Sequence, residues 1–504
     1  MIYIYIENKK FTKQISYVFD TIFQILGIDT VYMEESQYSL LTNKDILLLY
    51  IDKEDVHKQH KHLDVNKIFI LNSGELFSDS YLLDSSLPKD IRKLKLAFPI
   101  KDVNDVVSLY HGSSELYINK DNLQNNIVIS TNIDMISDTF FMLTRYEEFI
   151  NKRENYKERY GRFSVKDSIC YRYGLIQRPI VNEYIELIWS LIQEANFKGN
   201  RKKWWGNNEF AACLTHDVDE IKMYTDIFKV TKHMLALFIK YKDTKRALSF
   251  IKKYVEVLKD YKQDPFWTFE YLINTEIKYD FRSSFYFMSG GTSKYDGKYN
   301  INDKRLVKIL YKLYKLGFEA GYHGSFYSYG NLVKMKEEIK SLEKNIQIQS
   351  FGCRQHFLRF EIPSTWEIQE KSGLLYDTTL GYAEIEGFRS GICFPYKPFD
   401  LIENRVLNIW EIPLIVMDVT LKDEKYRHLN YKDGADVIIN LINTVKKYNG
   451  VFTLLWHNTS FTDEWNGWTQ VYEDTIKYLY ELNAFGVSGR EVINILNEEI
   501  RKAY

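Results

Sequence analysis

The chain has 504 residues with a formal net charge of −1, and 45% of them are hydrophobic and 27% charged. This composition is typical of globular proteins, and a chain of this length is expected to form more than one domain. The near-zero net charge excludes a molecule that binds nucleic acid through an overall basic surface.

The sequence predicts neither a disulfide framework nor a membrane anchor. Its four cysteines form no C-x-x-C pair, which favours a reducing compartment. No run approaches about 18 uninterrupted apolar residues. The start of the chain is charged from Glu7 onward, which does not fit a signal peptide. We therefore expect a soluble, cytoplasmic protein.

Residues 1–205 are predicted to form a smaller N-terminal domain with an α/β part and a helical part. Its expected elements are strands over 1–7, 45–51 and 67–71 and helices over 12–26, 135–151 and 181–195. Asp134 is the expected N-cap of the helix over 135–151, and the charged run from Arg145 to Glu148 is typical of a solvated or ion-paired helix face. No phosphate-binding glycine loop occurs here, so we expect a scaffold or docking role.

Residues 206–504 are predicted to form a second, larger domain in which strands and helices alternate. The expected strands cover 210–219, 282–288, 317–323, 348–353, 407–417, 451–457 and 484–487. The expected helices cover 264–278, 303–316, 332–345, 363–372, 435–448 and 472–482. Such alternation implies a mainly parallel sheet, here closed into a (β/α) barrel.

A basic segment interrupts this domain at about 221–262. It holds eleven Lys or Arg against four Asp or Glu, a local charge of +7 in a neutral chain. Its apolar residues recur at helical spacing, which predicts one long helix or a helical pair. The segment is either a solvated helix packed on the barrel or a surface for anionic lipid headgroups or a lipid-linked saccharide.

Ionisable side chains gather at the predicted strand ends, where barrel active sites lie. Asp217 and Asp219 alternate along the end of one buried strand and so share a face. The other strand ends carry His323, Arg354, His356, Asp418 and His457. Each histidine alone is typical of a structural residue, but together with two carboxylates they favour a metal site.

Four motifs in order resemble the polysaccharide deacetylase superfamily (carbohydrate esterase family 4). They are Thr-His-Asp217-Val-Asp219, Gly-Tyr-His323-Gly-Ser, Cys-Arg354-Gln-His356 and Leu-Leu-Trp-His457-Asn. The resemblance covers about residues 208–490 and implies a distorted, incomplete, TIM-like (β/α) barrel that removes acetyl groups from sugars with a metal. The upstream segment, with Arg145-Tyr-Glu-Glu and Gly-Arg162-Phe, resembles an uncharacterised domain that precedes such deacetylases in some bacterial surface-polysaccharide loci.

The resemblance implies a role for each motif residue. Asp217 matches the general base, and Asp219 and His323 match metal ligands. Arg354 matches the residue that orients the base, and His457 matches the general acid. An aspartate late in the family's sequence supports that histidine, and Asp418 is the candidate for it.

Two departures from the family pattern affect the metal site and the last motif. The family places a second metal-binding histidine four residues after the first, and Tyr327 stands there. His356 is the candidate replacement; otherwise the site holds its metal weakly, with more water, or holds none. Asn458 stands where an acid is common in the family.

The expected chemistry follows from these residue types. A divalent metal, zinc by default with nickel or cobalt as alternatives, polarises the acetyl carbonyl and lowers the pKa of bound water. Asp217 takes the proton of that water, held ionised by a bidentate pair with Arg354. His457 protonates the leaving amine.

The main hypothesis is a metal-dependent deacetylase that hydrolyses an acetamide or acetate ester on a sugar, nucleotide sugar or lipid-linked saccharide in surface-polysaccharide biosynthesis. Two alternatives remain at this stage. One is a catalytically degenerate carbohydrate-binding or scaffold protein. The other is a hydrolase of another non-peptide C–N bond, such as a formamide. The sequence does not decide the oligomeric state.

Overall fold

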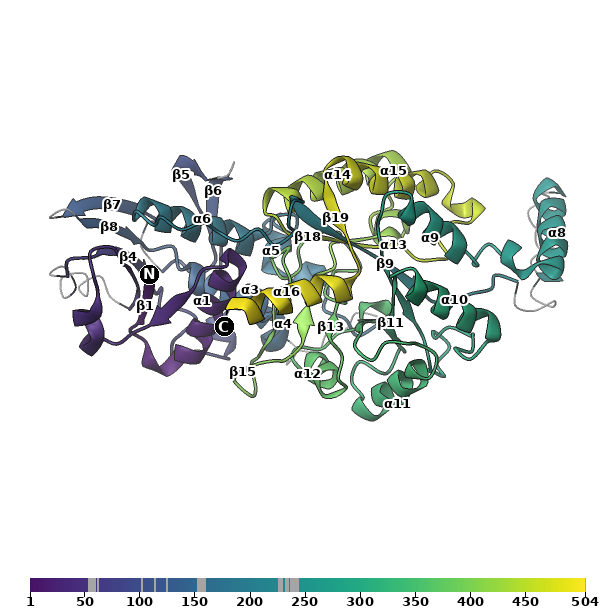
Figure 1. The fold of residues 1–504 in the computed structure, drawn as a ribbon, viewed down its shortest axis with the longest axis horizontal. Helices are drawn as coiled ribbons and strands as arrows, with labels where there is room; N and C mark the ends of the chain where they lie inside the picture. The colour runs from purple at the N-terminus through teal and green to yellow at the C-terminus, as the bar shows by residue number, and fades with distance from the viewer. Residues whose placement is uncertain are drawn as a thin grey trace.

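The computed structural model describes residues 1–52, 60, 63–100, 103–112, 115–123, 126–151, 160–224, 230–231, 235 and 244–503. Two mainly parallel sheets lie beside each other along the long axis of the molecule, and the helix α8 (Thr244–Lys259) stands at the far end (Figure 1). Among the described residues, no helix is both long and apolar enough to cross a lipid bilayer.

Within the described residues, the N-terminal sheet has six strands in the order β2-β1-β3-β4-β8-β7. Their bounds are β1 (Ile2–Ile6), β2 (Thr30–Tyr32), β3 (Ile46–Ile51), β4 (Asn66–Leu71), β7 (Ile118–Leu123) and β8 (Asn126–Thr131). All neighbouring pairs are parallel except β7 with β8. A separate antiparallel pair is formed by β5 (Arg92–Ile100) and β6 (Val103–Ser108).

Three amphipathic helices supply the core of this unit: α1 (Thr12–Leu26), α3 (Met135–Leu143) and α6 (Ile180–Glu194). Apolar side chains of all three join those of β1 and β3 in one buried cluster. Helix α1 ends at Gly27 in the left-handed conformation, where a side chain would be strained. The predicted helices over 12–26 and 181–195 and strands over 1–7, 45–51 and 67–71 are confirmed.

The predicted helix over 135–151 is wrong in its continuity. It is split into α3 and α4 (Tyr146–Asn151), because Arg145 takes a positive φ of 53° between them. Asp134 does cap α3, since its carboxylate accepts from the backbone of Ser137. The charged run is buried rather than solvated: the Arg145 side chain is 1% exposed.

Arg145 centres a buried ion-pair network that joins this unit to the barrel. Its guanidinium donates to Glu147 and Glu148 and to the hydroxyl of Tyr382. Arg389, from the barrel, donates to both carboxylate oxygens of Glu148. Breaking such a pair leaves a buried charge uncompensated, so the network specifies how the two units meet.

The second sheet is parallel and curled into a partial barrel, so the expected α/β architecture is confirmed at that level. Its order in the described part of the chain is β16-β13-β12-β11-β10-β9-β18-β17, and β19 also pairs with β9. The two end strands do not pair with each other there, which leaves the barrel open. The strands are β9 (Phe210–Val218), β10 (Ser284–Phe287), β11 (Glu319–Gly324), β12 (Gly352–Gln355), β13 (Tyr376–Asp377), β16 (Trp410–Glu411), β17 (Val416–Met417), β18 (Val451–Leu455) and β19 (Ala484–Gly486).

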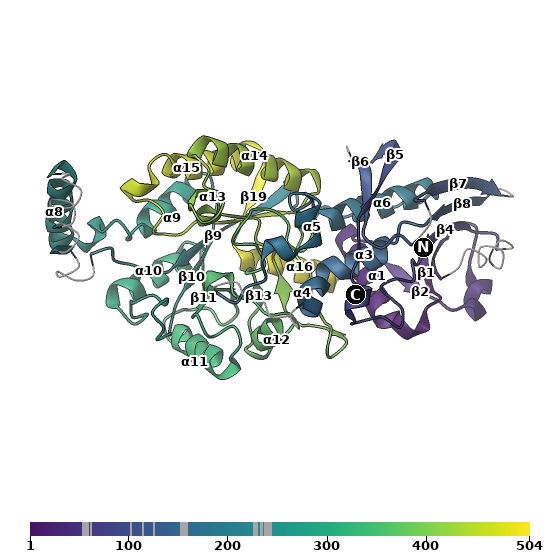
Figure 2. The same ribbon diagram turned by 180° about the vertical axis from the view of Figure 1, so that it is seen from behind.

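Helices cover the outside of this sheet, as the two opposite views show (Figures 1 and 2). They are α9 (Phe269–Ile277), α10 (Lys304–Lys315), α11 (Leu332–Glu343), α12 (Ser364–Lys371), α14 (Tyr431–Lys447) and α15 (Trp468–Glu481). The short helix α13 (Asp418–Lys422) instead follows the carboxyl end of β17. A short pair, β14 (Phe399–Asp400) with β15 (Arg405–Val406), projects from the barrel, and the short helix α5 (Ile169–Arg172) lies in the upstream chain.

Four sequence predictions for the barrel differ from the structure. The single strand expected over 407–417 is two strands, β16 and β17, which lie at opposite ends of the sheet order. The strand expected over 348–353 begins only at Gly352. The helix expected from Asp264 begins at Phe269, because the Asp264 carboxylate instead accepts from the backbone of Met223 and Phe266. The last helix, α16 (Gly489–Ala503), was not predicted.

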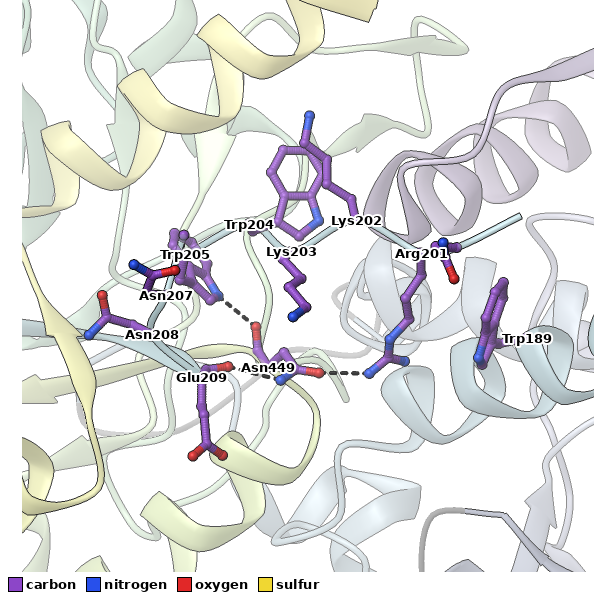
Figure 3. Close-up of a pocket in the computed structure, with 12 residues that line it drawn as sticks. Trp189, Arg201, Lys202, Lys203, Trp204, Trp205, Asn207, Asn208, Glu209 and Asn449 are labelled. Atoms are coloured by element: carbon purple, nitrogen blue, oxygen red, sulfur yellow. Dashed lines mark hydrogen bonds between the residues drawn. The ribbon is translucent and has the colours of Figure 1, made fainter. Parts of the chain in front are cut away.

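The division at residue 205 stays a prediction, because one hydrophobic cluster runs across it. That cluster contains residues of α1, α3 and α6 together with barrel and α16 residues such as Tyr286, Val451 and Leu496. A hollow of about 1000 Å³ lies at the same junction. In Figure 3, Trp205 and Arg201 reach Asn449 from two directions, and each donates a hydrogen bond of 2.7 Å to it.

The predicted basic insertion lies partly outside the described residues, at 225–229, 232–234 and 236–243. Its described part contains α8, which confirms helical structure over Thr244–Lys259. The chain enters the insertion a few residues after β9 and returns to the barrel at α9.

A buried carboxyl pair predicts a pH-dependent change in stability. Asp377 and Glu411 are register partners of β13 and β16, and both are fully buried. Burial and the neighbouring Asp377 raise the pKa of Glu411 well above its usual value. The folded protein therefore keeps a proton that the unfolded chain releases above about pH 4.3. Stability must then fall as the pH rises from there toward the folded pKa.

Glu411→Gln removes this titration, so its free energy of unfolding is expected to fall less than that of the parent between about pH 5 and pH 7. Urea denaturation at several pH values measures both. Glu403→Gln, at an exposed glutamate of the same barrel, is the matched control and should follow the parent. If the free energy of unfolding changed equally with pH in Glu411→Gln and in the parent, the raised pKa of Glu411 would be contradicted.

Candidate metal and catalytic site

The site is built on the end of β9, the central strand of the barrel sheet. β9 is buried along its whole length between β10 and β18. Asp217 is 3% exposed, and Asp219 follows the strand with its side chain 27% exposed. Because all neighbouring strands are parallel, their carboxyl ends bring His323, Arg354 and His457 to the same edge.

Asp219, His323 and His356 form a group of three metal-binding side chains in the described part of the chain. One ligand atom from each lies within 4.8 Å of the other two. Asp219 Oδ1 is 3.2 Å from His323 Nε2 and 3.5 Å from His356 Nε2. Two donors about 2.0–2.1 Å from a zinc ion, at the tetrahedral angle, are about 3.4 Å apart. The residues therefore fit a divalent ion between them.

The ring nitrogens of His323 are already assigned to suitable partners. Its Nδ1 lies 2.9 Å from the carbonyl oxygen of Arg354, which can only accept, so Nδ1 carries the hydrogen. Nε2, which lies 3.2 Å from Asp219 Oδ1, is therefore the nitrogen that would bind a cation held between these two residues. Among the described residues, none is a hydrogen-bond partner for the buried Nδ1 of His356, and Asp296 Oδ1 lies 3.9 Å away from that atom.

Asp219 and His323 shift each other's pKa. Burial raises the pKa of Asp219, but His356, His323 and His457 outweigh it and hold that pKa well below its usual range. Burial lowers the pKa of His323, while Asp217 and Asp219 raise it on balance. The Asp219 carboxylate is therefore ionised at neutral pH, the form in which a carboxylate binds a metal.

Arg354 holds Asp217 with one nitrogen rather than two, so the expected bidentate pair is wrong. Its Nη1 donates to Asp217 Oδ1 at 3.0 Å and to Thr215 Oγ1 at 2.7 Å. Its Nε and Nη2 donate to the backbone and side chain of Thr378. The guanidinium also lies over the Tyr286 ring. The guanidinium nitrogens of Arg354 are thus shared among Asp217, Thr215 and Thr378. The second oxygen of Asp217, Oδ2, is left facing His323, 3.7 Å from its Nε2.

His457 is paired with Asp418 on the other side of Asp219. Asp418 Oδ1 lies 2.7 Å from His457 Nδ1, and Oδ2 accepts from the His457 backbone at 2.8 Å. Burial lowers the pKa of His457, but Asp418 outweighs this and raises it to about 10. His457 is therefore an imidazolium at neutral pH. Its Nε2 points toward Asp219 Oδ2, 3.7 Å away.

The structure thus brings all seven predicted site residues to one place. The two departures from the family pattern have separate outcomes. Tyr327 is 56% exposed, and His356 instead joins Asp219 and His323 in the ligand group. Asn458 is fully buried and donates to the carbonyl oxygens of Glu220 and Phe266, which ties the start of the insertion to the barrel.

Sequence reasoning missed four residues that act around this site. Thr215 and Thr378 bind Arg354, Asp296 faces His356, and Arg162 lines the pocket. Thr215 belongs to the first motif and could have been noted. Asp296 carries no local signal, because it reaches the site through a loop distant in sequence. Arg162 was noted in the Gly-Arg162-Phe motif of the upstream segment, but with no role in this site.

The pocket over the site is small, at about 150 Å³. Its polar lining includes both aspartates, His356 and His457. Its apolar lining is formed by Phe357, Leu358, Met417, Val419 and Leu455. Sites for whole drug-sized ligands enclose roughly 300–1,000 Å³. This pocket instead suits a small acyl group, with the rest of the substrate outside.

One domain family and several solved structures are similar to this chain. A model described as a family of unknown function (DUF7033) matches residues 2–197. A search of curated proteins finds no match. Similar solved structures include proteins named as polysaccharide, peptidoglycan and carbohydrate deacetylases. A protein of Mycobacterium smegmatis assigned to the polysaccharide deacetylases has a TM-score of 0.39 and 13% identity, over 59% of this chain and 94% of that one.

Two further solved structures are similar at the same level. The peptidoglycan deacetylase PdaC of Bacillus subtilis has a TM-score of 0.24 and 13% identity, over 59% of this chain and 96% of that one. The carbohydrate deacetylase Agd3 has a TM-score of 0.34 and 8% identity, over 100% of this chain and 88% of that one. With all three scores below 0.5, the functional argument rests on the geometry of the site.

Proposed function

We propose that this protein is a metal-dependent deacetylase that hydrolyses an acetamide or acetate ester on a sugar, nucleotide sugar or lipid-linked saccharide. One observation carries the proposal. Asp219, His323 and His356 form a group that could hold a metal ion at the edge of the parallel barrel sheet. This group is flanked by Asp217, which Arg354 binds, and by the imidazolium of His457, which pairs with Asp418. This arrangement supplies a base, an acid and a Lewis acid in one small pocket.

The chain's own residues account for the proton transfers. Asp217 accepts the proton of the attacking water through the oxygen that Arg354 does not bind. His457, charged through Asp418, donates its proton to the leaving nitrogen or oxygen of the sugar. Asp219, His323 and His356 would hold the cation, with zinc as the first choice and nickel or cobalt as alternatives. A bound cation would polarise the acyl carbonyl and lower the pKa of water in the pocket.

The apolar wall of the pocket supports an acetyl group over a formyl group. Met417, Val419 and Leu455 offer contact to a methyl group, which a formamide lacks. A role in surface-polysaccharide biosynthesis, acting in the cytoplasm before export, agrees with this substrate class and is part of the proposal.

Metal content and acetate release test the proposal together. The purified protein is expected to bind about one zinc ion per chain and to release acetate from N-acetylglucosamine oligosaccharides or UDP-N-acetylglucosamine. A chelator should stop release and added zinc should restore it. Asp219→Ala should lose the metal, whereas Asp29→Asn, at an exposed carboxylate near the start of the chain, should not. Binding of saccharide with no metal and no release of acetate or formate would favour a binding protein instead.

A further inference from the structure

A short stretch of the upstream segment lies directly against the loop that carries His356. We call Tyr160–Phe163 the 160–163 segment and residues 356–359 the His356 loop. The Arg162 Nη1 donates to the carbonyl oxygen of Phe357 at 3.0 Å. The Tyr160 ring packs on the Phe357 ring with centroids 4.7 Å apart. In return, the Nε of Arg359 donates to the carbonyl oxygen of Tyr160 at 2.8 Å.

The His356 loop has a backbone that does not form without support. Phe357 and Leu358 have φ values of 61° and 52°, in the left-handed region that side chains other than glycine disfavour. Such conformations persist where surrounding contacts impose them, and they gather at functional sites. The imposed turn directly follows His356, so it sets where the imidazole of this residue lies.

The same contacts continue to the other face of His356. Arg359 also donates to the carbonyl oxygen of Phe326 and stacks on the Phe326 ring at 4.0 Å. The backbone of Phe326 donates to Asp296 Oδ1 at 2.7 Å, and this oxygen faces His356 Nδ1. Both sides of the His356 ring therefore depend on groups that Arg359 connects to the 160–163 segment.

We propose that the 160–163 segment is a positioning element for the third metal ligand, so that residues upstream of the barrel complete the metal site. The proposal rests on the metal site proposed above. It accounts for a metal site in which Tyr327 stands at the position of the family's second histidine. The replacement ligand, His356, lies on a loop whose conformation depends on the 160–163 segment as well as on the barrel. Arg162 acts through Phe357 on His356 and is not itself a ligand.

Zinc affinity, measured by competition with a chromophoric chelator, tests this role without relying on activity. Arg162→Met removes the donor to Phe357 and is expected to weaken zinc binding by about 10- to 100-fold, as loss of residues that orient metal ligands does elsewhere. Arg162→Lys keeps a donor and should recover part of the affinity. Arg172→Met, at an exposed arginine of α5, should bind zinc like the parent.

A double variant separates positioning from a general loss of structure. If Arg162 acts through His356, then Arg162→Met should have little further effect on zinc affinity in a His356→Ala background. Additive losses, or parent-like affinity in Arg162→Met, would overturn the inference while the proposed function stands. Absence of zinc binding in the parent itself would instead overturn the proposed function.

A second, independent observation concerns helix α8. One face of α8 packs on the chain that leads into it, since the rings of Phe250 and Tyr254 contact the ring of Tyr224 at 5.0 and 5.7 Å. The other side of the helix leaves Leu248 and Val255 exposed, at 62% and 42%. Leu258, exposed to 69%, lies at the edge of this face, about 60° from Val255. At 100° per residue, Leu248 and Val255 lie about 20° apart on that face, with Lys252 close beside them.

We infer that this face of α8 docks on an anionic lipid surface. Exposed leucine and valine side chains flanked by lysine are the chemistry of helices that lie in a membrane interface. The segment 221–262 carries +7, so the rest of the chain carries −8, and the charge of this segment is complementary to acidic headgroups. The insertion leaves the barrel just after Asp219, at the carboxyl ends of the strands, so a membrane bound there would lie on the catalytic side.

Vesicle co-sedimentation of the full chain tests the lipid surface. Vesicles containing phosphatidylglycerol are expected to bind the protein, and vesicles of phosphatidylcholine alone are not. Leu248→Ser with Leu258→Ser, and separately Lys252→Glu, should each lower the bound fraction several-fold. Ile402→Ser, at an isoleucine exposed to 62% on the barrel, is the control and should not. Equal binding to both vesicle types, or unchanged binding in the α8 variants, would overturn the inference. Self-association in solution that the α8 variants abolish would assign this face to a second copy.

Discussion

Asp217→Asn is expected to lower the rate of acetate release by about 10²- to 10⁴-fold, the usual contribution of a general base. The amide is nearly the same size as the carboxylate and can still accept from Arg354 Nη1 through its oxygen. It cannot take a proton from water. The loss should therefore appear in kcat, measured by acetate release at saturating substrate, while the fold is unchanged.

Metal content distinguishes this variant from a ligand variant. Asp217 is not one of the three grouped ligands, so Asp217→Asn should keep zinc at the level of the parent. Asp219→Ala should lose both zinc and activity. If Asp217→Asn also lost its zinc, Asp217 would be a ligand and the base would have to be another group.

Asp418→Asn is expected to lower kcat by about 10³- to 10⁴-fold, as removal of the carboxylate behind a catalytic histidine does in serine proteases. Asp418 lies 2.7 Å from His457 Nδ1 and raises the pKa of that ring to about 10. An amide in its place neither stabilises the imidazolium nor ensures that Nε2 faces the leaving group. The proton donor is therefore depleted at neutral pH.

The pH dependence of activity should also change in Asp418→Asn, and the pKa of His457 sets the direction of the change. His457 must be protonated to donate, so activity is lost as the pH rises through its pKa. Without Asp418 that pKa falls toward the ordinary value of about 6.5. The alkaline limb of kcat/KM should therefore move to lower pH in Asp418→Asn. An alkaline limb that stays where it is in the parent would assign the acid role to another residue. Asp29→Asn controls for the loss of one surface charge.

Much of the barrel could be predicted from local patterns. Alternation and apolar runs predicted most of its strands, because a strand buried on both faces is apolar along its length, as β9 is. The polar residues at strand ends were then expected to converge, and the structure places Asp217, His323, Arg354 and His457 at one edge. This follows from topology alone, since the carboxyl ends of parallel strands meet at one rim.

Long-range packing decided the features that local patterns missed. The residues over 407–417 have the composition of one strand, yet they supply two strands at opposite ends of the sheet. The run from Arg145 to Glu148 has the composition of a surface, yet it is buried, because Arg389 lies 241 positions from Glu148 and compensates its charge. Burial of a charge depends on a partner that no local window contains.

The sequence by itself determined the chemistry available to this protein: two carboxylates, three histidines, an arginine and a supporting aspartate at the ends of parallel strands. Only the tertiary structure decided which histidine joins Asp219 and His323. His356 does so through a strained turn held by Arg162, which is 195 positions from Phe357. The physical reason is that strand periodicity is encoded locally, whereas a left-handed turn at phenylalanine and leucine exists only where distant side chains impose it.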